Sequence, residues 1–328
     1  MTPIQTNLPP RIRNWEDPIQ LPPKIRNWED VAKAMQFFRL LELSNPATGK
    51  GEEWVFRGVP DAKDLNSLKT TLDVAAGDFG IRGEDVPQLE VDLILEFTRR
   101  YHLYSAESPP EKGDTLDWLA VMRHFGAPTR LLDFTFSFLV AVFFALERKE
   151  QHPKGLPTIW AINKSWLSHT VPPIFSRNKK LGKPFKRYLK SRNGNDFRDA
   201  FLERKEHVAS VYPVNPFRMN ERLTIQQGLF LCPGDVTKTF AENLMAIGEY
   251  TDNVKQIPID LGVDLRARKD LLMAIHRANM NRATLFPGLD GFAQSLWTRG
   301  IWLKHLRGME GADARLRLNL NIHSLREH

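Results

Sequence analysis

The chain contains a single cysteine, no long apolar run and none of the common metal-binding or phosphate-binding motifs. Cys232 alone can form neither an internal disulfide nor a cysteine-based metal site, as is typical of proteins in a reducing compartment. The most apolar stretch, Phe134 to Leu146, is too short to span a bilayer, and the N-terminus lacks a secretory signal. HExxH, GxxxxGK[ST] and GxSxG motifs are absent. We therefore expect a cytoplasmic protein that uses no metal.

The composition that remains is that of an ordinary globular protein. The 328 residues are 42% hydrophobic and 26% charged, which is enough apolar material for a large core. Cys232 lies in the apolar run GLFLCP, so we expect it in that core rather than as a nucleophile. No convincing linker occurs between residues 32 and 307, and we expect a single domain there, followed by a C-terminal tail at 308–328.

The chain begins with a duplication. IRNWED occurs at Ile12 to Asp17 and again at Ile25 to Asp30. The second copy leads into VAKAMQFFRLLEL, which has helical spacing, and Asn27 is placed to cap that helix. The first copy is followed by Pro18, which prevents the same continuation. We therefore interpret residues 1–31 as a flexible leader.

Strand and helix patterns alternate after the leader and predict an α+β protein with short strands. Strands are expected at residues 54–58, 128–135, 157–163, 228–233 and 254–259. Helices are expected at residues 88–104, 116–125, 137–149, 265–279 and 292–306. The helix at 137–149 is apolar on every side, which indicates that it is buried.

The excess positive charge is concentrated in one segment. Residues 177–192 carry eight basic side chains and no acidic one, whereas the whole chain has a net charge of +7. The segment belongs to a basic insertion at about 164–207. Because Phe185 and Tyr188 interleave the basic residues, phosphate neutralisation and base stacking could combine to bind RNA or DNA. The expected contacts are Lys179, Lys180, Lys183, Lys186, Arg187 and Lys190. The alternative is a solvated, mobile loop.

Four segments in order resemble the hallmarks of the FRG domain family, which is named for Phe-Arg-Gly. They are FRG at 56–58, WLAVMRHFGAPTRLLDFTFSFLVAVFFAL at 118–146, ERLTIQQGLFLCP at 221–233 and TLFPGLDGFA at 284–293. The resemblance extends over most of residues 54–306. The FRG family occurs in bacterial and phage proteins, some of which look like toxins or antiviral defence effectors.

A more distant resemblance links the chain to ADP-ribosyltransferases of the Arg-Ser-Glu type. Those enzymes have an arginine on a first strand, a Ser-Thr-Ser strand before a helix, and a Glu-x-Glu strand. Arg57 and the pair Thr135 and Ser137 match the first two features in order. The resemblance implies a split sheet of short strands flanked by helices, and an enzyme that transfers ADP-ribose from NAD or hydrolyses NAD.

The resemblance implies an NAD site in which arginine binds phosphate or ribose and hydroxyls position the nicotinamide end. The expected NAD-binding residues are Arg57, Gly58, Thr129, Arg130, Thr135, Ser137 and Gln226. Gln226 and Gln227 stand where the ADP-ribosyltransferases have the catalytic carboxylate of their Glu-x-Glu strand. A neutral amide cannot supply the negative charge that stabilises a ribosyl cation. Asp133 or His124 would then serve the acid–base step, with Gln227 orienting the ribose.

Each of these residues also has a structural interpretation. Arg57 and Asp133 could form an ion pair between strands, or Arg130 could be the partner of Asp133. Thr135 and Ser137 could cap the following helix, and the glutamines could bond to backbone. His124 could be favoured by a helix dipole. Functionally, the alternatives to an NAD enzyme are a non-catalytic module that binds a nucleotide or nucleic acid, and an adaptor whose protein partner fills the cleft.

Overall fold

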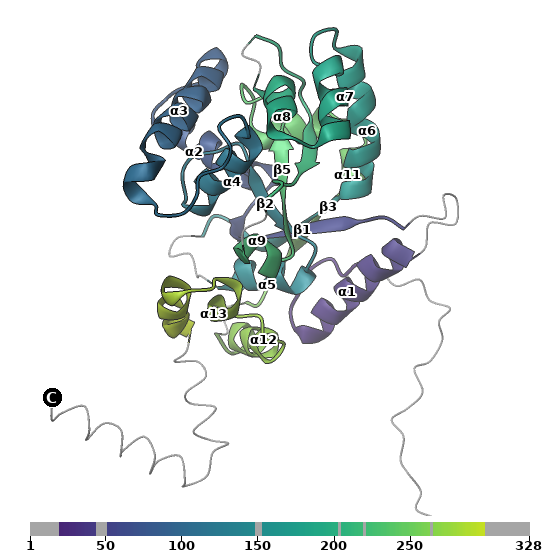
Figure 1. The fold of residues 1–328 in the computed structure, drawn as a ribbon. Helices are drawn as coiled ribbons and strands as arrows, with labels where there is room; N and C mark the ends of the chain where they lie inside the picture. Colours follow the sequence, from purple (N-terminus) through teal and green to yellow (C-terminus); the bar gives the residue numbers. More distant parts are fainter. Residues whose placement is uncertain are drawn as a thin grey trace, which may run out of the picture.

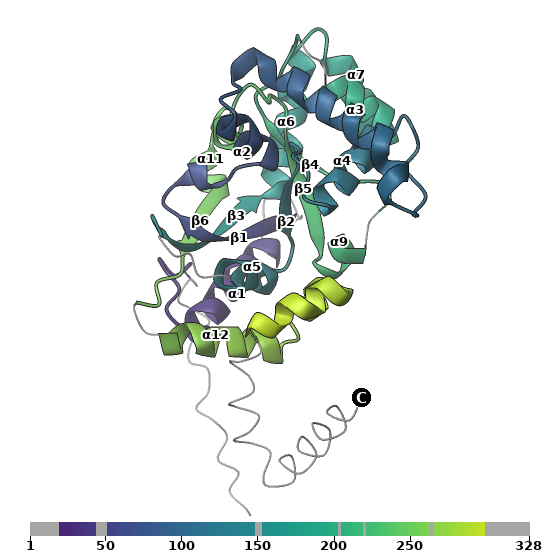
Figure 2. The same ribbon diagram turned by 90° about the vertical axis from the view of Figure 1, so that its left-hand side faces the viewer.

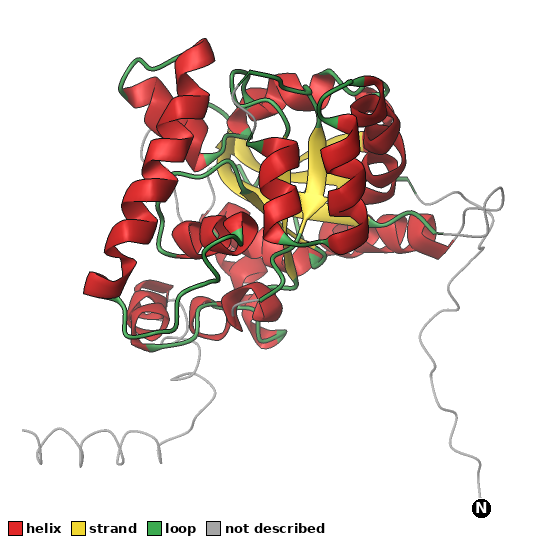
Figure 3. Ribbon diagram, turned by 45° about the horizontal axis from the view of Figure 1, so that its top comes forward, coloured by secondary structure: helices red, strands yellow, loops and turns green. Residues whose placement is uncertain are grey.

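A computed structural model describes residues 20–43, 51–147, 153–202, 205–218, 221–262 and 265–298. Helices surround a central sheet on all sides (Figures 1 and 3). The first IRNWED copy and the predicted tail at 308–328 lie outside the described residues. No helix within the described ranges is both long enough and apolar enough to cross a membrane.

Six strands form one antiparallel sheet in the order β4-β5-β2-β1-β3-β6. The strands are β1 (Trp54–Ala62), β2 (Leu132–Thr135), β3 (Leu156–Asn163), β4 (Val211–Val214), β5 (Gly228–Pro233) and β6 (Val254–Pro258). All five predicted strands are present, and the α+β class is confirmed. The sequence analysis missed β4, because its Pro213 argues against a strand; β4 lies at the edge of the sheet, where proline is tolerated.

The sheet has a weak seam in its middle. β1 and β2 share a single register pair, Phe56 with Thr135, whereas β1 pairs with β3 along most of its length. Figure 2 shows that β2 and β5 run in a different direction from β1, β3 and β6. The expectation of a split sheet therefore needs correction: the strands form one sheet, and the strand direction changes at the β1–β2 seam.

The helices account for most of the remaining described residues. They are α1 (Trp28–Leu43), α2 (Thr71–Asp78), α3 (Val86–Tyr104), α4 (Thr115–His124), α5 (Phe138–Leu146), α6 (Lys164–Arg177), α7 (Gly182–Ser191), α8 (Gly194–Phe201), α9 (Glu221–Ile225), α10 (Phe240–Met245), α11 (Tyr250–Asn253), α12 (Leu265–Arg277) and α13 (Arg282–Leu285). The predicted helix at 292–306 is helical over 289–298, and the rest of it lies outside the described residues. Asn27 caps α1 as predicted, since its Oδ1 accepts a hydrogen bond from Asp30 N at 3.0 Å.

Both faces of the sheet are buried, and β1 shows why. Trp54 and Phe56 belong to one hydrophobic cluster, with α1, α5 and α12, while Val55 and Val59 belong to another with α4, α6, α7 and α8. This follows from the alternation of side chains along a strand. The helix α5 is apolar all round because it lies between the sheet and a further layer of helices.

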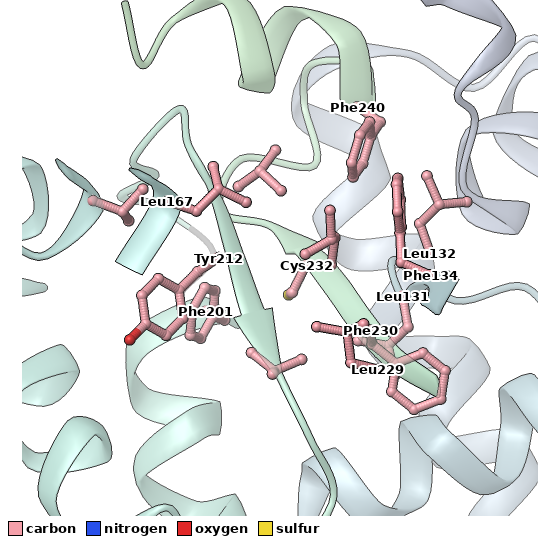
Figure 4. Packing of buried hydrophobic residues seen from close by; sticks show 14 of the residues in the cluster. Leu131, Leu132, Phe134, Leu167, Phe201, Tyr212, Leu229, Phe230, Cys232 and Phe240 are labelled. Carbon is pink, nitrogen blue, oxygen red and sulfur yellow. The ribbon is translucent and has the colours of Figure 1, made fainter. Parts of the chain in front are cut away.

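The larger cluster contains the single cysteine. Cys232 on β5 lies among Leu131, Phe201 and Phe240 and other apolar side chains (Figure 4), and none of its surface is exposed. Burial raises the pKa of the Cys232 thiol to about 12. The thiol therefore remains protonated at neutral pH, and the prediction that it lies in the core is confirmed.

The basic region at 164–207 contributes to the same cluster. Phe185 and Tyr188 on α7 are 1% exposed, and the ring of Phe185 stacks on Phe175 of α6 with 3.9 Å between centroids. Both aromatic side chains therefore lie inside the molecule. The alternative of a solvated loop is wrong for residues 182–191, since they form a helix with one buried face.

Candidate functional site

The three residues of the FRG tripeptide have three different environments on β1. Phe56 is buried in an aromatic group, 4.9 Å from Phe38 and 5.2 Å from Phe138 between ring centroids. Gly58 allows α5 to approach the strand, because a Cβ atom there would lie 1.8 Å from the carbonyl oxygen of Ala141. Arg57, between them, reaches β2 across the seam of the sheet.

A cavity of about 250 Å³ opens beside this seam. Five predicted site residues line it: Arg57, Gly58, Asp133, Thr135 and Gln226. The sequence analysis did not nominate the other lining residues, which are Phe56, Pro60, Arg123, Phe134, Phe144, Glu147 and Arg222. The tertiary structure thus brings together β1, β2, α4, α5 and α9, the last of which is distant in sequence (Figure 1). We call this cavity the arginine pocket.

Asp133 is the centre of the charge network in the arginine pocket. Its Oδ2 accepts a hydrogen bond from Arg123 Nε at 2.7 Å and a second from Arg123 Nη2. Arg57 Nη1 donates to the carbonyl oxygen of Asp133 at 2.7 Å and lies 3.8 Å from Oδ2. Burial would raise the pKa of Asp133, but the charges of Arg123 and Arg57 hold it below the ordinary value of 3.8. Asp133 is therefore ionised at neutral pH.

Arg57 is held at the pocket with part of its hydrogen-bonding capacity unused. Its side chain is 23% exposed, and its Nε is buried without a hydrogen-bond partner in the described structure. Burial lowers the pKa of Arg57 to about 10, since loss of water outweighs the attraction of Asp133. The guanidinium still carries its charge at neutral pH. An anion in the pocket would compensate for that unfavourable burial.

Arg222 joins the arginine pocket to a second cavity. It lines both, and the second cavity has a volume of about 750 Å³. The guanidinium of Arg222 lies 4.3 Å from the ring centroid of Phe286, and that of Arg282 lies 4.2 Å from the same ring. Arg282 in turn donates to both carboxylate oxygens of Glu147, at 2.6 and 2.7 Å. Both arginines therefore contact the ring of Phe286, and Arg222 lines both cavities.

His124 lies in the second cavity rather than the first. It lies near the end of a helix, as expected, and is the last residue of α4; its ring lies 4.9 Å from that of Phe125. Burial, with a smaller contribution from the charge of Arg222, lowers the pKa of His124 below 6.5. The imidazole is therefore neutral at pH 7, which does not fit the interpretation of a cation favoured by the helix dipole.

Arg130 and Thr129 do not reach the arginine pocket. Arg130 is fully buried and pairs with Glu90 of α3, with 2.7 Å between Nε and Oε1. Its Nη1 also donates to the carbonyl oxygen of Phe201 at 2.7 Å. Thr129 is buried, and its backbone N–H donates to Thr71 Oγ1 at 3.0 Å. The expectation that Arg130 contacts a cofactor, or pairs with Asp133, is corrected: its donors hold α3 and the chain around Phe201 together.

Three predicted residues have hydrogen bonds that shape the chain. Thr135 Oγ1 donates to the carbonyl oxygen of Gln226 at 2.6 Å and accepts from Ser137 N at 2.9 Å. Ser137 is the N-cap of α5. Gln226 Nε2 donates to the carbonyl oxygen of Leu285 at 2.9 Å. Gln227 does not line the pocket; it adopts the left-handed conformation, with φ of 48°, where the chain turns from α9 into β5. The capping interpretation is therefore confirmed for Ser137, and the backbone-bonding interpretation for Gln226.

Arg123 and Arg222 are the important residues that the sequence analysis missed. Arg123 is adjacent to His124, which was nominated, and Arg222 lies inside the segment ERLTIQQG. Neither has a distinctive spacing, because helices α4 and α9 each present one arginine. The available signal was their position beside nominated residues: Arg123 precedes His124, and Arg222 lies four residues before Gln226.

Residues 52–154 match the family model of the FRG domain, and the chain carries an FRG domain in that region. The matched residues include Arg57, Arg123 and Asp133, so the centre of the charge network lies inside the domain. The segments at 221–233 and 284–293 lie outside the match. The chain matches no curated protein and no solved structure.

Proposed function

We propose that the arginine pocket binds a nucleotide through its phosphate groups, with NAD as the expected ligand. The observation that carries this proposal is the charge of the walls. Arg57, Arg123 and Arg222 line the pocket. Of the two acidic residues that line it, Asp133 and Glu147, the second is already bound by Arg282. The arginines are in excess, and their planar forks of donors match phosphate oxygens.

The size of the site favours an elongated ligand. Pockets for small molecules and cofactors have volumes of about 300–1,000 Å³. The arginine pocket, at about 250 Å³, suits one end of such a ligand, and the neighbouring cavity of about 750 Å³ offers room for the rest. Because Arg222 lines both cavities, it is placed to bind phosphates at the junction. A dinucleotide such as NAD has its phosphates in its middle.

Cleavage of NAD is a second candidate function, supported by Asp133. Its carboxylate lines the pocket and is ionised, so it could stabilise the positive charge that develops on ribose as nicotinamide leaves. Arg123 and Arg57 neutralise much of that charge, which is why binding is the first proposal and cleavage the second. Cleavage would agree with a role as a toxin or antiviral effector, as the family resemblance implies.

Calorimetric titration of the full chain tests binding. The ligands are NAD, ADP-ribose, pyrophosphate and nicotinamide, and we expect the first two to bind and nicotinamide alone not to bind. Arg222→Gln should weaken NAD binding by about 10- to 100-fold, the equivalent of one charge-assisted hydrogen bond. Arg100→Gln is the matched control, because Arg100 is an exposed arginine on α3 that pairs with the exposed Glu96 at 2.7 Å. The proposal would be contradicted if Arg222→Gln and Arg100→Gln lost the same NAD affinity, or if the wild type gave no heat of binding with any nucleotide.

Release of nicotinamide from NAD, followed by chromatography, tests the second candidate. Asp133→Asn should abolish release while the variant still binds NAD. The variant is compared with the wild type by circular dichroism, so that loss of folding is recognised. Binding without release by the wild type would leave the first proposal standing and remove the second.

A further inference from the structure

The outer face of α7 carries a row of basic side chains. Lys183, Lys186, Arg187 and Lys190 are spaced at i, i+3, i+4 and i+7, which places them on one side of a helix, and all four are exposed. The opposite side of the same helix carries the buried Phe185 and Tyr188, and so it is anchored in the core. The helix therefore presents positive charge on a rigid support.

Some of the basic residues predicted to bind nucleic acid are neutralised within the protein. Arg187 pairs with Asp199 at 2.8 Å and lies 3.3 Å from Asp196. Lys180 pairs with Glu206 at 2.8 Å. Among the described residues, no ion-pair partner occurs for the four other lysines of the group. These are Lys179, Lys183, Lys186 and Lys190. We call these four the lysine row; Lys183, Lys186 and Lys190 lie on α7, and Lys179 precedes that helix.

We propose that the lysine row binds the phosphate backbone of double-stranded nucleic acid without reading its sequence. Along the helix axis, Lys183 and Lys190 are separated by a rise of about 10 Å. This corresponds to about three base-pair steps of 3.4 Å. The three lysines of α7 thus extend over about the same length as three phosphate steps of one strand. Long, flexible lysine side chains neutralise phosphates as point charges and discriminate little between sequences.

Burial of the aromatic residues decides between double and single strands. Proteins that hold single strands without sequence preference stack bases on exposed aromatic rings. The sequence suggested such stacking on Phe185 and Tyr188, and this expectation is wrong because both rings are 1% exposed. The lysine row can therefore use the phosphate backbone but no stacking platform on α7, and a duplex has the higher density of phosphates.

Membranes and proteins fit the lysine row less well. A helix that binds a membrane surface buries an apolar face in the lipid, but the apolar face of α7 is already inside the protein. None of the residues of α7 is a large exposed apolar side chain, so the helix itself offers no apolar anchor to a protein partner; the exposed Phe217 lines a cavity with Tyr188 and Arg192 at the C-terminal end of α7. Helix α7 lies at the opposite end of the molecule from α12 (Figures 1 and 2), and none of the four lysines lines the arginine pocket, so the inference does not depend on that pocket.

Fluorescence anisotropy with a labelled 20-base-pair DNA of random sequence, at several salt concentrations, tests this proposal. Each phosphate contact gives a slope of about −0.9 in log K against log salt, so the four lysines should give about −3.6. The triple variant Lys183→Gln, Lys186→Gln, Lys190→Gln should lower affinity at least tenfold and make the slope shallower by about 2.7. The control is the triple variant Lys63→Gln, Lys69→Gln, Lys112→Gln, at three exposed positions. It has the same net charge as the first variant and should retain the affinity and the salt slope of the wild type.

Three further ligands complete the test: double-stranded RNA, a single strand of equal length, and vesicles that contain anionic lipid. We expect the two duplexes to bind alike and the single strand more weakly. The proposal is overturned if the wild type does not bind duplex, if the control variant loses as much affinity as the first, or if vesicles or the single strand bind more tightly than duplex.

Discussion

Arg57 and Asp133 join the two halves of the sheet at its seam. Arg57 Nη1 donates to the carbonyl oxygen of Asp133 at 2.7 Å, while the side chain of Asp133 is bound by Arg123. Between these strands only one register pair exists, Phe56 with Thr135. The arginine of the FRG tripeptide therefore has a structural role and at the same time lines the arginine pocket. The sequence analysis offered these roles as alternatives, whereas the geometry is compatible with both.

Asp133→Asn should destabilise the protein at neutral pH. The change leaves Arg123 and Arg57 without a counter-charge, and breaking a buried pair costs about 3–5 kcal/mol. Because the side chain of Asp133 is 31% exposed, we expect a smaller decrease of roughly 1–3 kcal/mol in the free energy of unfolding. Urea denaturation measures it. Asp78→Asn, at an exposed position, should change the free energy by less than about 0.5 kcal/mol. An equal decrease in the free energy of unfolding in the two variants would contradict a stabilising charge network around Asp133.

The same variant should change the dependence of stability on acid. The pKa of Asp133 is lowered in the folded protein, so its contribution is complete above the unfolded value of 3.8 and is lost as pH falls below it. The difference between wild type and Asp133→Asn should therefore shrink as pH falls below about 4. Urea denaturation at a series of pH values checks this, and a difference that stays constant down to pH 2 would exclude a lowered pKa.

Gly58→Ala should be far more harmful than another glycine substitution in the same domain. Its Cβ would lie 1.8 Å from the carbonyl oxygen of Ala141, so α5 would have to move away from β1. Overpacking of this kind costs about 1–3 kcal/mol or more. Gly77→Ala is the control: nothing lies within 4 Å, the residue is helical, and stability should rise by roughly 0.4–1 kcal/mol. Thermal unfolding compares them, and similar melting temperatures would refute the close approach.

The pKa of His124 should depend on Arg222. Burial and the charge of Arg222 both lower it, so Arg222→Gln should raise it toward 6.5. NMR titration of the histidine Cε1–H signals measures the shift, with His124→Gln to assign the resonance. His276, whose pKa is lowered by burial alone, serves as the internal control and should not move. An unchanged pKa of His124 would mean that the two side chains do not face each other.

The lowered pKa of His124 also predicts how stability depends on pH near neutrality. Its contribution is present above pH 6.5 and is lost as pH falls through the folded pKa, because the unfolded chain takes up the proton first. His124→Gln should therefore lose less stability than the wild type between pH 6.5 and 5. Equal losses in urea denaturation would show that His124 does not contribute.

Glu90 and Glu96 offer a direct comparison of buried and exposed ion pairs on one helix. Both are on α3 and both bind an arginine, but Glu90 and Arg130 are 2% exposed, whereas Glu96 and Arg100 are 50% and 61% exposed. Glu90→Gln leaves a buried charge unpaired and should lower the free energy of unfolding by roughly 3–5 kcal/mol. Glu96→Gln should lower it by about 0.5 kcal/mol or less. Denaturant titration of both variants checks this, and similar losses would show that the core does not depend on the Glu90 pair.

Much of the local structure followed from sequence patterns. Asn27 marked the start of α1, and the apolar segment at 137–149 indicated a buried helix, because capping and periodicity are properties of neighbouring residues. Elements without such signals were missed. The strand β4 contains a proline, and helix α6 contains Pro172 and Pro173, so local rules argue against both, whereas packing in the core stabilises them.

The candidate site was predicted only in part. Arg57, Asp133 and Gln226 line one cavity, as was expected from the order of their segments in the more distant ADP-ribosyltransferase resemblance. Arg130 could not be distinguished from them by its neighbours in the sequence. Arg130 lies three residues from Asp133 in the sequence, yet it is paired with Glu90 of α3, forty residues earlier. Charge and order in the sequence do not reveal which acid an arginine will meet.

The sequence by itself determined the α+β class, most strands, the FRG domain and the concentration of basic residues in one segment. These depend on residue type and on local spacing, which the chain carries without folding. The tertiary structure alone decided that Arg57, Arg123 and Arg222 share one pocket, that Phe185 and Tyr188 are buried, and that Arg130 is structural. Each of these depends on contacts between segments far apart in the chain, where packing and desolvation choose the partners.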